Sequence, residues 1–221
     1  MLQSRLDVAS FTRASLLPDM AAMEQIHPAL ITSEVPVFFA TTDGQTRRIA
    51  HHLSTMMKER GFDSRAIDMA SSDADFIDWT RVRAIIVGAC VRGQHHQHAA
   101  EGFVKSYAAD LARHPSVFFS VSLAAASHDA SKQDAARKLA ADFPIRFGWH
   151  PDMVLCFAGR LAYTRYRTIM RFVMKHIANK AGFPTDTSRD HEFTNWDQVA
   201  GLADDVGRLI RNRTAGATLV A

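Results

Sequence analysis

Short apolar segments alternate with amphipathic segments from residue 35 onward, and this alternation constrains the fold more than any other feature. The expected strands are residues 35–40, 63–69, 82–89, 116–123 and 153–159. The expected helices are residues 47–60, 99–113, 131–143 and a last one beginning near residue 195. Continuous apolar strands between helices are typical of a parallel sheet that is buried on both faces. The sequence therefore predicts an α/β fold, a doubly wound five-stranded parallel sheet with helices on both faces.

Such a sheet binds ligands in the loops at the carboxyl ends of its strands. The loop after the first strand reads Thr41-Thr42-Asp43-Gly44-Gln45-Thr46 and leads directly into a helix. Backbone N–H groups and the dipole of a helix N-terminus favour an anion. The loop lacks the lysine of a Walker loop and the glycine triplet of a dinucleotide fold. It suits a terminal phosphate monoester such as that of FMN; the alternative is an ordinary strand–helix turn capped by Thr46.

This loop resembles the phosphate loop of flavodoxin-like proteins, whose pattern is Ser/Thr-x-Thr-Gly-x-Thr. Thr41, Gly44 and Thr46 match the pattern, whereas Asp43 stands where it has threonine. An acid beside a phosphate is unfavourable unless its side chain turns away to cap the helix or bond a nearby amide. The string Asp-Gly-Gln-Thr-Arg is similar to the form in one branch, the quinone-dependent protoporphyrinogen IX dehydrogenases. Residues 86–96, 118–123, 158–167, 185–187 and 194–199 resemble the same branch, so the resemblance spans about residues 35–210.

The resemblance implies which residues bind FMN. Thr41, Thr42, Asp43, Gly44, Gln45 and Thr46 would hold its phosphate. Two loops would flank its ring, and their residues are Cys90, Val91, Arg92, Gly93 and Gln94 together with Ser122, Leu123 and Ala124. Neither loop places an aromatic residue where many flavodoxins stack one on the ring. For Cys90 the alternative is a small core residue at a strand end.

Residues 160–193 form a long, basic helical insertion after the fifth strand. Residues 160–180 contain six basic residues and no acid, so with a net charge of +3 for the whole chain the remainder sums to −3. The spacing predicts a helix with an apolar side and a basic side, typical of a helix lying on an anionic membrane. Alternatives are a helix packed on its own domain with a solvated basic face, or calmodulin-type or nucleic-acid recognition.

The resemblance favours the membrane, because the family works with a membrane quinone, and it argues against nucleic acid. The residues expected to contact substrate or membrane are Arg165, Arg167, Arg171 and Lys175. Their guanidinium groups suit the propionate carboxylates of a tetrapyrrole substrate. Tyr163, Tyr166 and Phe172 would offer an apolar approach for the quinone.

The rest of the chain adds boundaries rather than chemistry. Residues 1–33 are expected to be a poorly ordered extension or to precede the true start, residues 34–213 the domain, and residues 214–221 a frayed tail. Two cysteines exclude a disulfide framework, and no apolar run approaches the ~18–20 residues that span a bilayer. We expect a cytoplasmic protein, peripheral on the inner face of the cell membrane. His95, His96 and His98 lack acidic or thiolate partners for a metal, and proton uptake is the alternative role.

The function implied is FMN-dependent oxidation of protoporphyrinogen IX to protoporphyrin IX, with a quinone as the electron acceptor. The chemistry would come mainly from the cofactor, and no protein nucleophile is expected. Two other functions remain open. One is a flavodoxin-type electron carrier, although the basic insertion differs from the acidic face of such carriers. The other is a non-catalytic, flavodoxin-like membrane-docking module that has lost FMN.

Overall fold

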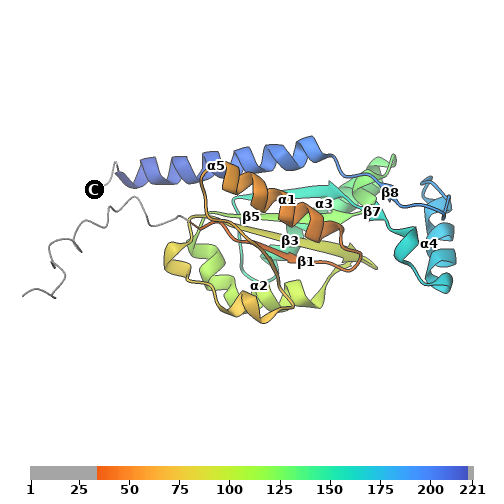
Figure 1. Cartoon of the computed structure of the whole chain (residues 1–221), viewed down its shortest axis with the longest axis horizontal. Coiled ribbons are helices and arrows are strands. Elements are labelled where there is room, and N and C mark those ends of the chain that lie inside the picture. Colours follow the sequence, from red (N-terminus) through yellow and green to blue (C-terminus); the bar gives the residue numbers. More distant parts are fainter. Residues whose placement is uncertain (1–33, 219–221) are drawn as a thin grey trace, which may run out of the picture. The chain divides into compact units, whose positions relative to one another are not determined.

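The computed structural model describes residues 34–218, and a parallel sheet forms the centre of this region (Figure 1). Its strand order is β2-β1-β3-β5-β6, and all four neighbouring pairs are parallel. The strands are β1 (Val37–Ala40), β2 (Ala66–Asp68), β3 (Ile85–Arg92), β5 (Ser116–Ser122) and β6 (Met153–Ala158). The predicted doubly wound, five-stranded parallel sheet is thus confirmed. A short strand that the sequence did not predict, β4 (His95–His96), pairs antiparallel with the end of β3.

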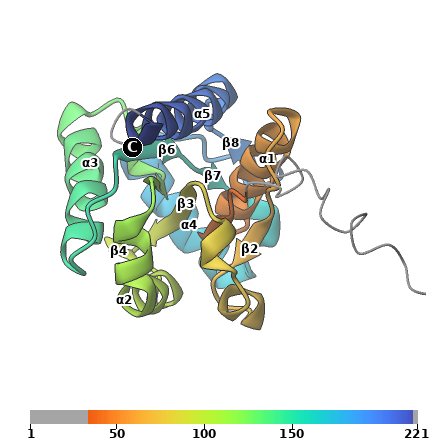
Figure 2. The same ribbon diagram turned by 90° about the vertical axis from the view of Figure 1, so that its left-hand side faces the viewer.

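Helices cover both faces of the sheet (Figure 2). One face carries α1 (Gln45–Glu59) and α5 (Trp196–Thr218), and the other carries α2 (His98–Arg113) and α3 (Ala130–Ile145). Successive strand residues point to opposite faces. Phe119 therefore packs under α1 and α5, whereas its neighbour Phe118 packs under α2 and α3. Such pairs of apolar neighbours explain why the strands read as continuous apolar runs.

Close packing inside the sheet requires a glycine in β3. Gly88 is the direct neighbour of Phe119 in β5. A Cβ atom at Gly88 would lie 2.0 Å from Cζ of the Phe119 ring, closer than atoms can approach. The ring fills the space that the missing side chain leaves.

The last helix runs further than the sequence predicted. The side-chain oxygen of Asn195 accepts a hydrogen bond from the Gln198 N–H at 3.1 Å and so caps the start of α5. However, α5 continues to Thr218 instead of ending before the tail that was expected to fray from residue 214. The expectations for residues 1–33 and for residues 219–221 lie outside the described residues.

The insertion folds around a small core of its own, beyond the carboxyl ends of the strands (Figure 1). It contains a two-stranded ribbon, β7 (Arg160–Leu161) with β8 (His191–Glu192), a 3₁₀ turn at Tyr163–Arg165 and helix α4 (Thr168–Lys180). Its buried residues are Leu161, Ala162, Tyr163, Tyr166 and Ala178. None of the helices in the described part of the chain is long and apolar enough to cross a membrane.

Candidate functional site

A cavity of about 410 Å³ lies at the carboxyl edge of the sheet. The loops after β1, β3 and β5 form one part of its wall, and α4 with the preceding turn forms the other. All predicted cofactor residues line it except Gly44, Gln94 and Ala124. Gly44 supplies backbone to the first loop, whereas Gln94 and Ala124 line a neighbouring groove beside α3. The structure therefore brings together three loops that the sequence could only nominate separately.

The first loop carries a buried hydroxyl group without a partner. Gly44, with φ of 86°, occupies the cap position of α1, and its N–H donates to Thr41 Oγ1 at 3.0 Å. Thr46 lies inside the first turn of the helix, so it is not the cap that the alternative reading required. Its side chain is fully buried, and its Oγ1 has no hydrogen-bond partner among residues 34–218. Since buried polar groups are almost always paired, this hydroxyl is available to a ligand in the cavity.

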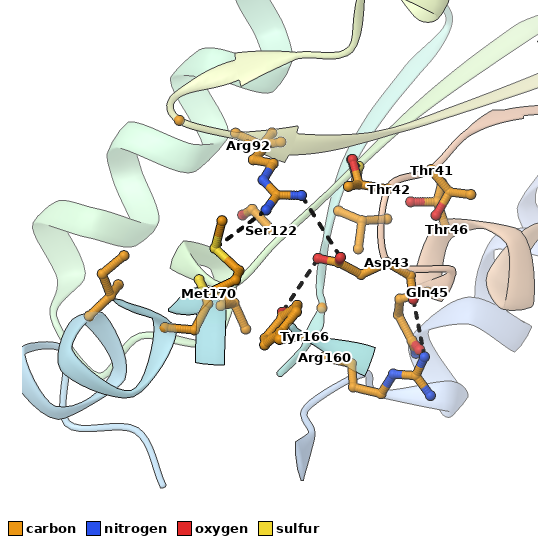
Figure 3. A pocket seen from close by; sticks show the side chains of 18 of the residues that line it. Thr41, Thr42, Asp43, Gln45, Thr46, Arg92, Ser122, Arg160, Tyr166 and Met170 are labelled. Carbon is orange, nitrogen blue, oxygen red and sulfur yellow. Dashed lines mark hydrogen bonds and ion pairs between the residues drawn. The ribbon is translucent and has the colours of Figure 1, made fainter. Parts of the chain in front are cut away.

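Asp43 turns its carboxylate away from the loop backbone (Figure 3). One carboxylate oxygen lies 3.9 Å from the Arg92 guanidinium, and the other accepts the Tyr166 hydroxyl at 3.4 Å. Burial, together with the negative charge of Asp43, raises the pKa of Tyr166 to about 12. The expectation that the acid must turn aside is confirmed, but its partners come from β3 and the insertion rather than from the helix cap.

The Gln45 side chain, although predicted to bind the cofactor, connects α1 with the insertion. Its amide donates to Glu192 Oε1 and to Thr194 Oγ1, both at 2.8 Å. Arg48 donates to the other Glu192 oxygen at 2.8 Å. Gln45 would therefore offer an anion its backbone N–H in the first turn of α1, because its side-chain amide is already bonded to Glu192 and Thr194.

The loop after β3 contacts the first loop through Cys90. Its Sγ lies 3.6 Å from Thr42 Oγ1, and Thr42 also accepts a hydrogen bond from the Gln97 amide. Cys90 is half-buried in β3, where it packs against the core under α1 and α5 and also lines the cavity, so both readings of this residue stay open. The two ring loops contain no aromatic residue, but Tyr166 of the insertion lines the same cavity.

Two arginines of the insertion reach the first loop, although in the sequence Arg160 counted only toward the basic charge and Arg165 was predicted to contact substrate or membrane. Arg160 Nη2 donates to the Asp43 carbonyl oxygen at 3.2 Å, and Arg165 Nη1 donates to the same oxygen at 3.5 Å. Arg160 also pairs with Asp190 at 3.7 Å. More than a hundred residues separate each arginine from Asp43, so no local motif could have revealed these contacts.

The predicted basic side of the insertion helix is interrupted at Arg171. Its Nε donates to the Tyr163 carbonyl at 3.1 Å and its Nη2 to the Tyr166 carbonyl at 3.4 Å. Tyr163 itself is fully buried and donates to the Pro184 carbonyl at 3.0 Å. The prediction of a quinone approach at Tyr163 is therefore corrected, because this side chain is buried in the insertion. Arg171 is half-buried and bound to the insertion, so its contact with substrate or membrane stays a prediction. Arg167 and Lys175 remain exposed.

The apolar side of α4 is packed on the domain only in part. Ala178 is buried and Met174 packs on the insertion core. By contrast, Ile169 is 82% exposed, Phe172 is 70% exposed, and Val173 and Ile177 are about half exposed. The alternative of a helix packed on its own domain therefore describes only part of this side. Met170, Val173, Met174 and Ile177 also line the cavity, so the exposed apolar side continues into the cavity wall.

The histidines after β3 have different environments. His96 is buried between Phe118 and Phe143, and its Nε2 lies 3.0 Å from Ser120 Oγ. Burial, assisted by Arg146, lowers the pKa of His96 to about 4, which disfavours proton uptake there. His95 and His98 are exposed. Within residues 34–218 no three His, Cys, Asp or Glu side chains gather as metal ligands would.

Comparison with known proteins identifies the class. A family model described as "Flavodoxin domain" matches residues 36–188, which is more than half of the chain. The chain therefore belongs to the flavodoxin domain family, as its strand order and its first loop indicate. A solved flavodoxin from the domain Archaea aligns with a TM-score of 0.44 and 13% identity, covering 80% of this chain and 99% of that chain.

Relatives place the chain more narrowly. Protoporphyrinogen IX dehydrogenase (quinone) of Escherichia coli K12 is 34% identical over 173 residues, covering 78% of this chain and 94% of that protein. The Leishmania major protein of the same name is 29% identical over 178 residues, covering 78% of this chain and 74% of that protein. The chain belongs to the protoporphyrinogen IX dehydrogenase (quinone) family, which confirms the resemblance drawn from its motifs.

FMN is the cofactor that the flavodoxin domain implies, and the residues present fit it. The unpartnered Thr46 hydroxyl, the left-handed Gly44 and the first turn of α1 would hold its phosphate. The loops after β3 and β5 leave a largely apolar space beside that site.

Proposed function

We propose that this protein oxidises protoporphyrinogen IX to protoporphyrin IX with FMN as cofactor and a quinone as electron acceptor. The observation that carries the proposal is the 34% identity to a protein of that name over 94% of its length. The cavity supports the proposal. The loops after β1, β3 and β5 form part of its wall, and the insertion forms the rest. A substrate reaching bound FMN would therefore meet residues of α4.

The chain would bind and shield the cofactor rather than supply a reacting group. The phosphate would lie at residues 41–46, and the ring between Cys90–Gly93 and Ser122–Leu123. Bound FMN would supply the two-electron acceptor for each of three successive oxidations of the substrate. Tyr166 and Met170 would exclude water from one side of the ring site. The high pKa of Tyr166 keeps its hydroxyl protonated and neutral at physiological pH.

We further propose that α4 lies in the headgroup region of the inner face of the cell membrane. Its exposed apolar side and the flanking Arg167 and Lys175 suit an anionic membrane surface. The same apolar side reaches the cavity, so a quinone dissolved in the bilayer would approach the cofactor along it. Arg167 and Lys175 also remain candidates for the propionate groups of the substrate.

The activity is tested with FMN-loaded protein under anaerobic conditions, with protoporphyrinogen IX and a soluble quinone analogue. Formation of fluorescent protoporphyrin IX that depends on both protein and quinone is the expected result. Flavin reduction that never exceeds one turnover would instead indicate an electron carrier. Purified protein that stays colourless and takes up no FMN would indicate the docking module.

The membrane contact is tested by sedimentation with vesicles of phosphatidylglycerol and phosphatidylcholine. Since Phe172 is 70% exposed, its burial in the membrane contributes about 2 kcal/mol, and Phe172→Ser should weaken binding roughly 10- to 30-fold. Phe76→Ser is the matched control, because Phe76 is 77% exposed but follows β2 rather than lying on α4. Equal effects of the two substitutions would contradict docking through α4.

A further inference from the structure

The Asp43 carbonyl oxygen is the meeting point of two positive charges. Arg160 and Arg165 both donate to it, at 3.2 and 3.5 Å. Two guanidinium groups on one neutral oxygen repel each other unless negative charge lies nearby. Asp190 pairs with Arg160 at 3.7 Å and also attracts Arg165 from beyond ion-pair distance, whereas the Asp43 carboxylate is directed to Arg92 and Tyr166.

Arg165 has no carboxylate within ion-pair distance in the described part of the chain. Its side chain is exposed, and its Nη1 lies against Gly44, only 2.9 Å from the position that a Cβ atom would take there. The guanidinium therefore covers the backbone at the N-terminus of α1, where an anion is favoured. The buried, unpartnered Thr46 hydroxyl is a second and independent sign of a ligand at this position.

We propose that Arg165 binds the phosphate of FMN, so that the insertion makes the cavity select FMN over riboflavin. This inference rests on FMN being the cofactor of the proposed function. Guanidinium groups recognise phosphate oxygens with strong, charge-assisted hydrogen bonds. The first loop contains no cation of its own, and Arg165 supplies the missing one from 120 residues further along the chain.

The role differs from the one that the sequence suggested for Arg165, which was contact with substrate or membrane. Only Tyr166 and Arg167 lie between Arg165 and the start of α4. The helix that we propose to lie on the membrane therefore begins close to the residue that we propose to bind the phosphate of FMN. Arg160, held by Asp190 and nearly buried, would add a second positive charge at the Asp43 carbonyl.

The test measures flavin affinity of the full-length apoprotein by fluorescence quenching, with FMN and riboflavin as separate probes. Arg165→Ala should weaken FMN binding about tenfold or more and change riboflavin binding less than twofold. Arg165→Lys should recover part of the FMN affinity, because it keeps the charge. Arg189→Ala is the matched control, since Arg189 is an exposed arginine of the same insertion that pairs with Asp186.

Equal weakening of FMN and riboflavin by Arg165→Ala would overturn the proposal and indicate a structural role at Asp43. Unchanged affinity for both flavins would also overturn it and return Arg165 to substrate or membrane contact. The experiment is independent of the proposed enzymatic activity, because no porphyrinogen is present. A protein that selects FMN through Arg165 but fails to oxidise porphyrinogen would refute only the proposed function.

Discussion

The stability of the domain should fall steeply between pH 7 and pH 5 because of one buried histidine. His96 is only 2% exposed, and it packs against Phe118 and Phe143. Its Nδ1 has no hydrogen-bond partner, and its Nε2 faces the Ser120 hydroxyl. A proton added to this ring would place a charge among aromatic side chains, and burial therefore lowers the pKa of His96 from 6.5 to about 4.

The unfolded chain binds this proton more tightly than the folded one, so stability is lost as the pH falls. The contribution of neutral His96 is complete above pH 6.5 and decreases toward pH 4. With these two pKa values, linkage gives a loss of about 2 kcal/mol at pH 5 and about 3 kcal/mol below pH 4. That is a large share of the stability of an ordinary domain.

Urea unfolding at pH 7, 6 and 5, followed by circular dichroism, measures this loss. His96→Gln removes the titrating group but keeps an amide that can bond Ser120, so it should be less stable at pH 7 and less sensitive to pH. The difference between its unfolding free energies at pH 7 and 5 should be about 2 kcal/mol smaller than for the unmodified chain. His95→Gln is the control, because His95 is exposed on the same strand. Identical pH dependence of the His96→Gln variant and the unmodified chain would refute this account.

Two glycines give further predictions. Gly88→Ala should destabilise the fold by about 1–3 kcal/mol, because the new methyl group overlaps the Phe119 ring; the midpoint of thermal unfolding reports it, and an unchanged midpoint would contradict the packing described. Gly44→Ala should lower the affinity for FMN more than it lowers the free energy of unfolding. The φ of 86° is strained for alanine, which reduces stability, and the new methyl group displaces Arg165, which reduces affinity. Flavin titration measures the affinity and thermal unfolding measures the stability.

The sheet could be predicted from the sequence because its signal is local. Apolar runs such as residues 116–123 and 153–159 coincide with β5 and β6 to within a residue. The second strand was predicted over residues 63–69 but spans only Ala66–Asp68, because Asp63 makes just an isolated bridge to Glu34. Strand ends depend on the neighbouring strand, which a local pattern does not record.

The cofactor loops could be nominated by their position after strands, but the partners of their side chains could not. Asp43 shows the difference. Its need to turn aside follows from electrostatics alone, whereas its partners Arg92 and Tyr166 come from separate segments. The insertion held most of what sequence reasoning missed, since its arginines were read as one basic surface. In the structure Arg160 donates to the Asp43 carbonyl and Arg171 donates to the Tyr163 carbonyl.

Because Arg171 is bound within the insertion, we expect apolar contacts, more than charge, to hold α4 on a membrane. With Arg171 turned inward, mainly Arg167, Lys175 and Lys180 stay exposed along the helix, beside the apolar side chains of Ile169 and Phe172. Salt screens exposed charges but does not weaken apolar burial. Raising the ionic strength from ~0.1 to ~0.5 M should therefore leave most of the affinity for anionic vesicles in place. The same affinity should fall sharply in the Phe172→Ser variant at either salt concentration. Complete release of the unmodified chain by salt would show instead that charge, and not the apolar side of α4, holds it on the membrane.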